Sequence, residues 1–241
     1  MGTRRGRGLR VAAGRSAANR PRARGRGAKR EDAPRHAGRP VGATGDRTRE
    51  RIIQKGLQTF AELGFAGASV RDIARKARIR VSSLYHYFSS KEALYQAVQD
   101  RVQEQLRELM LGVMGQGLDL RGMTREAVGR LFDFFLANPA YVQLGYRAHL
   151  EGTGDTETFR RVTDRWLGLM EGLMKPAELQ GTIKPVDPAL FLVTVDALVH
   201  WHTASDAFYR GFLGKGLDDP EIARRVRDHL VQMVLRAVGL E

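Results

Sequence analysis

Apolar residues recur at helical intervals along almost the whole chain after residue 45. In the segment 46–64 the apolar stripe lies opposite polar residues, and Gly64 is a natural helix stop. That stripe consists of Ile53, Leu57, Phe60 and Ala61. A second, shorter segment begins at Ser69, whose hydroxyl can cap a helix, and ends near Ala77. The pattern therefore predicts a first helix followed by a short second helix.

The next segment predicts a helix-turn-helix. The four residues 78–81 separate the second helix from the short run 82–88, "SSLYHYF". Ser89 or Ser90 then caps a long helix whose first turn holds Glu92, a favourable place for a negative charge. Two short helices across a tight turn, next to a longer one, are typical of this DNA-binding motif.

Helical patterns also fill the rest of the chain, with Gly and Pro at their ends. The segments are 124–138, 140–152, 156–174, 187–214 and 218–241. The sequence contains no alternating strand patterns and no repeat of fixed period. We expect an all-α protein of about nine helices, with a three-helix helix-turn-helix domain at 46–94 and a second helical domain at 95–241.

Most of the net charge of +13 belongs to residues 1–45, which hold twelve Arg and one Lys against Glu31 and Asp32. This segment has no Phe, Tyr or Trp and is rich in Arg, Gly, Ala and Pro. It therefore lacks the apolar surface needed to fold, and we expect a disordered tail. Two interpretations stay open: the tail binds DNA phosphates, with 38–40 ("GRP") in a minor groove, or it is an incidental leader without a role.

Composition and spacing exclude several classes of protein. The chain has no cysteine, so disulfides and thiolate metal sites are impossible, and a reducing cytoplasm is the expected compartment. No apolar run approaches the roughly 18 residues of a membrane span. P-loop, nucleophile-elbow and metal-ligand spacings are missing, and His202 with Asp206 would need further ligands. We therefore expect neither an enzyme nor a metal site, and no cofactor.

Residues 48–98 resemble the DNA-binding domain of the tetracycline-repressor (TetR) family of bacterial transcriptional regulators. The matching residues are Phe60, Gly64, Phe65, Ser69, Val70, Ile73, Ala74, the block 84–88 ("LYHYF") and Lys91. The C-terminal two-thirds match only as a helical pattern of suitable length. The resemblance implies a sequence-specific regulator: a ligand-released repressor that binds a palindromic operator as a homodimer. The alternative is a non-specific architectural protein that binds DNA through its basic tail.

The aromatic run in 84–88 is expected to face DNA. Leu84 and Phe88 lie four residues apart and can bury against the preceding helices, which turns the three residues between them outward or sideways. The expected DNA-binding set is Ser69, Arg80, Val81, Ser82, Ser83, Tyr85, His86, Tyr87 and Lys91.

The resemblance also implies roles for several of these residues. Ser69, Tyr87 and Lys91 would contact phosphates, whereas Tyr85 and His86 would lie nearer the bases. Tyr and His carry hydrogen-bonding groups on rigid rings, which suits both phosphates and base edges. For Tyr85 a purely structural role, packed between helices, stays open.

The turn before this run departs from the family pattern. Where the family has a turn glycine and a capping serine, this chain has Arg78 and Arg80. If position 78 has a positive φ, the loss of glycine costs about 1 kcal/mol, and the loss of a capping oxygen costs a similar amount. Arg80 can in return read guanine as a bidentate donor; alternatively, both arginines only neutralise phosphates.

The last two helical segments are expected to form a dimer interface. The segment 218–241 has a continuous apolar stripe, and 187–214 is apolar on more than one side, so it needs both its own core and a second subunit. The expected interface consists of Phe191, Val195, Leu198, Ile222, Val226, Leu230, Met233, Val234 and Ala237. The resemblance implies a four-helix bundle between subunits; the alternative is that both helices belong to the core of a monomer.

The resemblance further implies a small-molecule effector held between the long helix and this bundle. Candidate lining residues are Phe134, Phe135, Tyr141, Tyr146, His149, Trp166, Met170, His200, Trp201 and His202. Such an aromatic and Met-containing set suits a largely apolar ligand with a few polar atoms. Each of these residues taken alone is also compatible with ordinary core packing.

Overall fold

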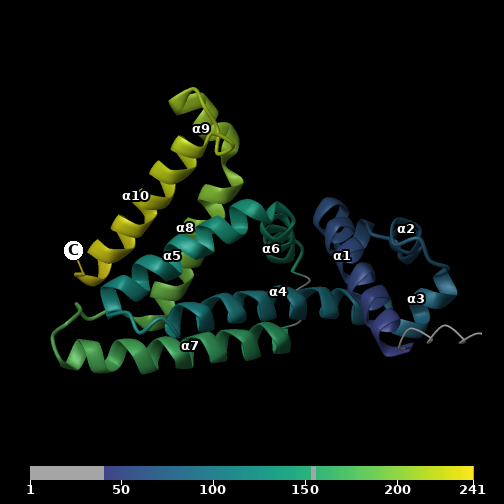
Figure 1. Cartoon of the computed structure of the whole chain (residues 1–241), viewed down its shortest axis with the longest axis horizontal. Coiled ribbons are helices and arrows are strands. Elements are labelled where there is room, and N and C mark those ends of the chain that lie inside the picture. The colour runs from purple at the N-terminus through teal and green to yellow at the C-terminus, as the bar shows by residue number, and fades with distance from the viewer. Residues whose placement is uncertain (1–40, 153–155, 241) are drawn as a thin grey trace, which may run out of the picture. The chain divides into compact units, whose positions relative to one another are not determined.

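The computed structural model describes residues 41–152 and 156–240, without the side chains of 41–44 and 156–159. Its regular elements within these ranges are ten α-helices (Figure 1). They are α1 (Val41–Gly67), α2 (Val70–Lys76), α3 (Val81–Tyr87), α4 (Lys91–Met114), α5 (Leu120–Ala137), α6 (Pro139–Glu151), α7 (Thr156–Leu179), α8 (Pro188–Ala204), α9 (Asp206–Leu213) and α10 (Pro220–Val238). The all-α prediction is confirmed. None of the described helices is long and apolar enough to cross a membrane.

The first helix begins earlier than predicted. α1 starts at Val41, so the last five residues of the segment expected to be disordered, 41–45, are helical. No proline interrupts this stretch, and Pro40 lies just before it, where a proline does not disturb the helical hydrogen bonds. The remainder of the expected tail, 1–40, lies outside the described residues.

The predicted segment 187–214 is two helices instead of one. Ser205 leaves helical geometry, with φ −101° and ψ 34°, and separates α8 from α9. Its hydroxyl donates to Trp201 O at 2.5 Å. This side-chain bond occupies a carbonyl at the end of α8, which stabilises the break.

The first hydrophobic core joins α1, α2, α3 and the start of α4. Its members without exposed surface include Ile52, Phe60, Ile73, Leu84 and Leu94. α1 breaks at the predicted stop, Gly64 (φ 73°, ψ 174°), and the chain continues from there to α2. The core extends to Val98, past the expected domain boundary at residue 94, because α4 runs through that boundary.

The second core lies among α5, α6, α8 and α10. Phe132, Leu230 and Leu235 have no exposed surface in it. A smaller third core joins the end of α7 to the end of α10, around Met174 and Val238. α6 contacts α1, α5 and α8, so it connects the first core to the second.

Candidate DNA-binding surface

Ser69 starts the helix-turn-helix as the N-cap of α2. Its hydroxyl accepts the Asp72 N–H at 3.1 Å and donates to Asp72 Oδ2 at 2.7 Å. The Ser69 hydrogen bond, followed by that of Arg75 at 2.6 Å, holds the pKa of Asp72 below its ordinary value. Because the single hydroxyl proton of Ser69 is used by Asp72, a bond from this hydroxyl to a phosphate requires an exchange of partners.

The turn between α2 and α3 has the geometry that the sequence led us to expect. Arg78 has φ 54° and is the only non-glycine residue with positive φ in the described part of the chain. Arg80 occupies the N-cap of α3 without a side-chain capping bond. The side chains of Arg78 and Arg80 are exposed, so both guanidinium groups remain accessible to DNA.

α3 is anchored by one side and displays the other. Leu84 and Phe88 are buried in the first core, as predicted. Tyr85 is 49% exposed, so it does not pack between helices, and His86 is exposed beside it. Tyr87 is half-buried against the first core, with its ring edge-on to His86 at 5.7 Å.

The serines and the valine at the start of α3 differ in exposure. Ser82 is exposed and Ser83 is half-exposed. Val81 is half-buried and packs against the first core, so only part of this predicted DNA contact is available. The reason is that Val81 begins the same helical turn that carries Leu84 inward.

Lys91 lies at the start of α4, behind the N-cap Ser90. Its ammonium lies 4.5 Å from the ring centroid of Phe65 and 3.4 Å from Ala66 O. The side chain is partly exposed, so its charge can reach a phosphate while the aromatic ring supports it. Arg49 of α1 similarly lies over the Phe88 ring at 5.2 Å, a basic group that the sequence pattern did not single out.

An aromatic cluster occupies the second core. His200 lies 4.3 Å from Phe135 and 6.3 Å from Tyr146, measured between ring centroids. Phe134 stacks on Tyr141 at 5.4 Å, and the Tyr141 hydroxyl is hydrogen-bonded to Gln105. The structure thus brings together five of the predicted effector-lining residues.

His200 is the ionisable member of this cluster. Burial acts to lower its pKa, but the hydrogen bond to Asp196 and the charge of Asp196 outweigh burial, so the pKa of His200 is raised above its ordinary value. The ion pair joins Nδ1 of His200 to Oδ1 of Asp196 at 3.1 Å. The imidazole of His200, held by Asp196, is therefore a polar group that a ligand atom in the cluster could meet.

Family models match both the DNA-binding segment and the helical domain. Residues 52–98 match "Bacterial regulatory proteins, tetR family", and residues 122–234 match "Tetracyclin repressor-like, C-terminal domain". The chain belongs to the TetR family. It is therefore a DNA-binding transcriptional regulator and not an enzyme, as the sequence predicted.

Individual relatives agree with the family models. The HTH-type transcriptional repressor NicS of Pseudomonas putida is 21% identical over 142 residues, which cover 58% of this chain and 67% of that protein. A TetR family transcription regulator from Marinobacter aquaeolei has a TM-score of 0.68 at 23% identity, with 82% and 98% of the two chains covered. AibR, solved in complex with isovaleryl coenzyme A and operator DNA, has a TM-score of 0.62 at 20% identity, with 77% and 97% covered.

In this TetR regulator, the α8 residues predicted to form the dimer interface lie partly within the subunit. Phe191, Val195 and Leu198 are partly buried and pack against the second core. The exposed stripe of α8 lies on the other side and contains Leu190, Val193, Ala197 and Trp201. Because α8 is apolar on all sides, its periodicity does not distinguish the side that packs within the subunit from the exposed side, and the interface of α8 stays a prediction.

The predicted face of α10 is also largely internal. Ile222, Val226, Leu230 and Val234 are buried within the single chain, where α10 packs on α5. Only Met233, 40% exposed, and Ala237 of the predicted set are open to solvent. The apolar stripe of α10 is real, but it supplies the second core of its own subunit.

Several predicted effector residues lie apart from the aromatic cluster. Trp201 is 51% exposed and packs against Phe208 at 5.6 Å, on the outer stripe. His202 is hydrogen-bonded to the Tyr209 hydroxyl. Met170 packs against the third core.

The other two predicted residues, His149 and Trp166, are exposed and half-buried respectively. The C-terminal part of the sequence matches the TetR family only as a helical pattern. Such a pattern does not predict which side chains become neighbours. In the described residues no group of three or more His, Asp or Glu is placed to hold a metal ion.

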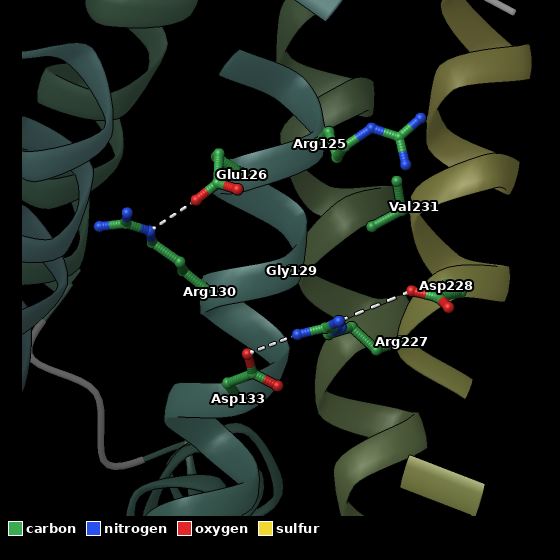
Figure 2. A pocket seen from close by; sticks show the side chains of 8 residues that line it. All are labelled: Arg125, Glu126, Gly129, Arg130, Asp133, Arg227, Asp228 and Val231. Atoms are coloured by element: carbon green, nitrogen blue, oxygen red, sulfur yellow. Dashed lines mark hydrogen bonds and ion pairs between the residues drawn. The ribbon is translucent and has the colours of Figure 1, made fainter. Parts of the chain in front are cut away.

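Two hollows on the helical domain do not coincide with the aromatic cluster. One of about 680 Å³ lies between α9 and α10 and includes His202 and Tyr209. The other, about 320 Å³, lies between α5 and α10 (Figure 2). Its wall is formed by ion pairs, including Arg227 to Asp133 at 3.2 Å. Such mutually paired charges do not suit the apolar ligand that the aromatic cluster favours.

Proposed function

We propose that this TetR regulator is a repressor that holds a palindromic operator as a homodimer and releases it when a largely apolar effector binds its helical domain. The geometry of α3 carries the proposal, because Leu84 anchors this seven-residue helix while Tyr85 and His86 point away from the core. A helix of this kind fits the major groove and brings its outer side chains to the base edges. The protein acts in the bacterial cytoplasm, at the nucleoid.

In the operator complex Arg80, Tyr85 and His86 face the bases. Arg80 has no capping bond to give up and can donate two hydrogen bonds to one guanine. Tyr87 and Lys91 hold phosphates, and each is supported from behind: Tyr87 by the first core and Lys91 by an aromatic ring. Supported side chains lose less conformational freedom on binding.

The remaining residues of the expected set assist this contact. Ser82 and Ser83 lie in the first turn of α3, where free backbone N–H groups and hydroxyls attract phosphate. Ser69 exchanges its bond to Asp72 for a phosphate oxygen. Val81 contributes only its exposed edge.

Dimerisation is supported by the outer stripe of α8. Leu190 and Val193 are each 66% exposed, and the stripe continues through Ala197 and Trp201 to Phe208 of α9. A contiguous apolar surface of this kind marks an interface. Two subunits joined there would present two copies of α3, which a palindromic operator requires.

The effector hypothesis rests on the aromatic cluster. Phe134, Phe135 and Tyr146 supply apolar surface, and the imidazole of His200, held by Asp196, supplies a polar group. A largely apolar ligand with a few polar atoms fits this combination. The AibR complex with isovaleryl coenzyme A, an acyl thioester, is compatible with the same ligand class.

Selection of duplexes from a random pool tests the DNA-binding half. We expect a palindrome whose half-sites lie about 34–36 Å apart, bound at least about 1000-fold more tightly than random DNA. A truncation that starts at Val41 keeps the whole of α1. Specific binding that survives this truncation supports the repressor, whereas loss of all binding supports the non-specific, tail-dependent protein.

Light scattering tests the dimer. Trp201→Glu places a charge in the proposed interface and should produce monomers, whereas Arg121→Glu on α5 should leave dimers intact. A stable wild-type monomer contradicts the proposal.

Displacement of the protein from its selected operator by isovaleryl coenzyme A or octanoate, used as probes, tests the ligand class.

A further inference from the structure

The end of α1 is held by two side chains of α6, which lies beside it (Figure 1). Arg147 donates from Nε to Ala61 O and from Nη2 to Glu62 O, both at 2.7 Å. These carbonyls lie in the last turn before the break at Gly64, where a helix lacks its own N–H partners. One guanidinium therefore caps the helix that supports the DNA-binding domain.

Glu151, one turn further along α6, holds the residue after the break. Its carboxylate accepts the Phe65 N–H at 3.1 Å and lies 3.5 Å from the Arg147 guanidinium. The approach is so close that a Cβ on Gly64 would collide with this carboxylate. We call Arg147 and Glu151 the α1 clamp.

The α1 clamp continues toward the proposed phosphate contact. The Phe65 backbone is held by Glu151, and the Phe65 ring lies under the Lys91 ammonium at 4.5 Å. The same ammonium lies 3.4 Å from Ala66 O. A shift of the segment 64–66 therefore shifts the support of Lys91.

α6 also contacts the aromatic cluster, through the residues just before Arg147. Tyr146, the neighbour of Arg147 in α6, lies edge-on to His200 at 6.3 Å. Gly145 lies against the same ring, since a Cβ built on it would be 3.6 Å from His200 Nε2. Three consecutive residues, 145–147, thus contact α8 on one side and α1 on the other.

We propose that Arg147 and Glu151 are positioning residues, which set the orientation of the DNA-binding domain and couple it to the occupancy of the aromatic cluster. The proposal rests on the proposed function and assigns its regulation to these two side chains. A ligand that moves Tyr146 moves Arg147 with it, because both belong to one helical turn. The two carbonyls of α1 follow, and operator binding weakens.

Coupling of this kind is reciprocal, so it can be measured without an effector. Operator binding should change the environment of His200 in the wild type. We expect the His200 ring resonances in NMR spectra of the full chain to shift when the selected operator is added. In Arg147→Met, saturated with the same operator, this shift should be lost.

The same variant should bind DNA differently. Arg147→Met is expected to bind the operator about tenfold more weakly, in the usual range of coupling between sites, and to lose its preference in a series of duplexes whose half-site separation changes one base pair at a time. Arg121→Met, on α5, is the matched control and should behave as the wild type. Arg147→Lys keeps the charge but not the fork and should fall between them.

Each outcome decides one point. Absence of sequence-specific binding by the wild type overturns the proposed function and the coupling with it. If the wild type binds its operator and Arg147→Met shows the same affinity, spacing preference and His200 shift, the α1 clamp alone is refuted. A lower melting temperature with an unchanged His200 shift would make Arg147 a purely structural residue, and should Arg147→Met not fold, Arg147→Lys and Glu151→Ala decide by the same readouts.

Discussion

α3 and α8 expose side chains of different polarity. α3 buries Leu84 and exposes Tyr85 and His86, whose rings carry polar groups that water can solvate. α8 exposes Leu190 and Trp201 in a stripe that offers water little to bond. A surface of the first kind tolerates repeated release from its partner, whereas the second needs a lasting cover. The proposed DNA contact and the proposed subunit contact therefore differ in chemistry.

The largest expected effect comes from making the same substitution in both helices. Leu84→Ala removes a side chain with no exposed surface and should lower the free energy of unfolding by about 2–5 kcal/mol. Leu190→Ala removes one that is 66% exposed and should leave the stability of an isolated subunit almost unchanged, while it weakens the dimer. Denaturant titrations at several protein concentrations separate the two effects. Equal losses for both variants would mean that α8 is covered within its own subunit.

The break in α1, which α6 holds, should be nearly as sensitive to substitution. Gly64 has φ 73° and ψ 174°, a region used almost only by glycine, and lies against the Glu151 carboxylate. Gly64→Ala should therefore cost about 1–3 kcal/mol in thermal or denaturant unfolding. Gly67→Ala, where a Cβ would meet Leu63 at an ordinary 3.5 Å, is the control. A neutral Gly64→Ala would show that α6 does not hold this segment tightly.

The sequence predicted the side-chain roles in the helix-turn-helix domain closely, and those in the second helical domain only in outline. Gly64, Leu84 and Phe88 have the expected roles because each helix there has one apolar side and a spacing specific to the family. α8 is apolar all round, so the choice between Leu190 and Phe191 depends on tertiary packing that the sequence pattern does not contain. The α1 clamp was not foreseen, because Arg147 lies 86 and 85 residues along the chain from its two carbonyl partners, and a local pattern does not predict such contacts.

The DNA-contacting side of α3 can be divided by its dependence on sequence and salt. Lys91→Met should weaken binding to all duplexes alike, by about tenfold near 0.1 M salt, and reduce the salt slope by about 1. Arg80→Ala should instead change which base is preferred in each half-site. Fluorescence anisotropy with selected and altered operators, at several salt concentrations, measures both. Uniform losses for Arg80→Ala would assign Arg80 to phosphate.

The His200–Asp196 pair at the aromatic cluster should make a smaller, pH-dependent contribution to stability. The pKa of His200 is raised in the folded chain, so its pair with Asp196 stabilises fully below the unfolded pKa and is lost as pH rises through the folded pKa. The gain should be less than about 1 kcal/mol because Asp196 is largely exposed. Melting temperatures from pH 5.5 to about 8.5 should therefore fall more in the wild type than in Asp196→Asn. Parallel profiles would show that the pair does not contribute.

The smallest expected effect is a gain in stability, at the turn that leads into α3. Arg78 has φ 54°, a conformation that strains a residue with a Cβ by about 1–2 kcal/mol, while glycine in its place adds unfolded-state entropy of about 0.5–1 kcal/mol. Arg78→Gly should therefore stabilise the chain by about 0.5 kcal/mol. Arg71→Gly, inside α2, should destabilise it by about 1 kcal/mol, so one substitution acts with opposite sign seven residues apart. If chemical denaturation shows a loss for Arg78→Gly as well, the Arg78 side chain must stabilise the folded turn by more than its backbone strain costs.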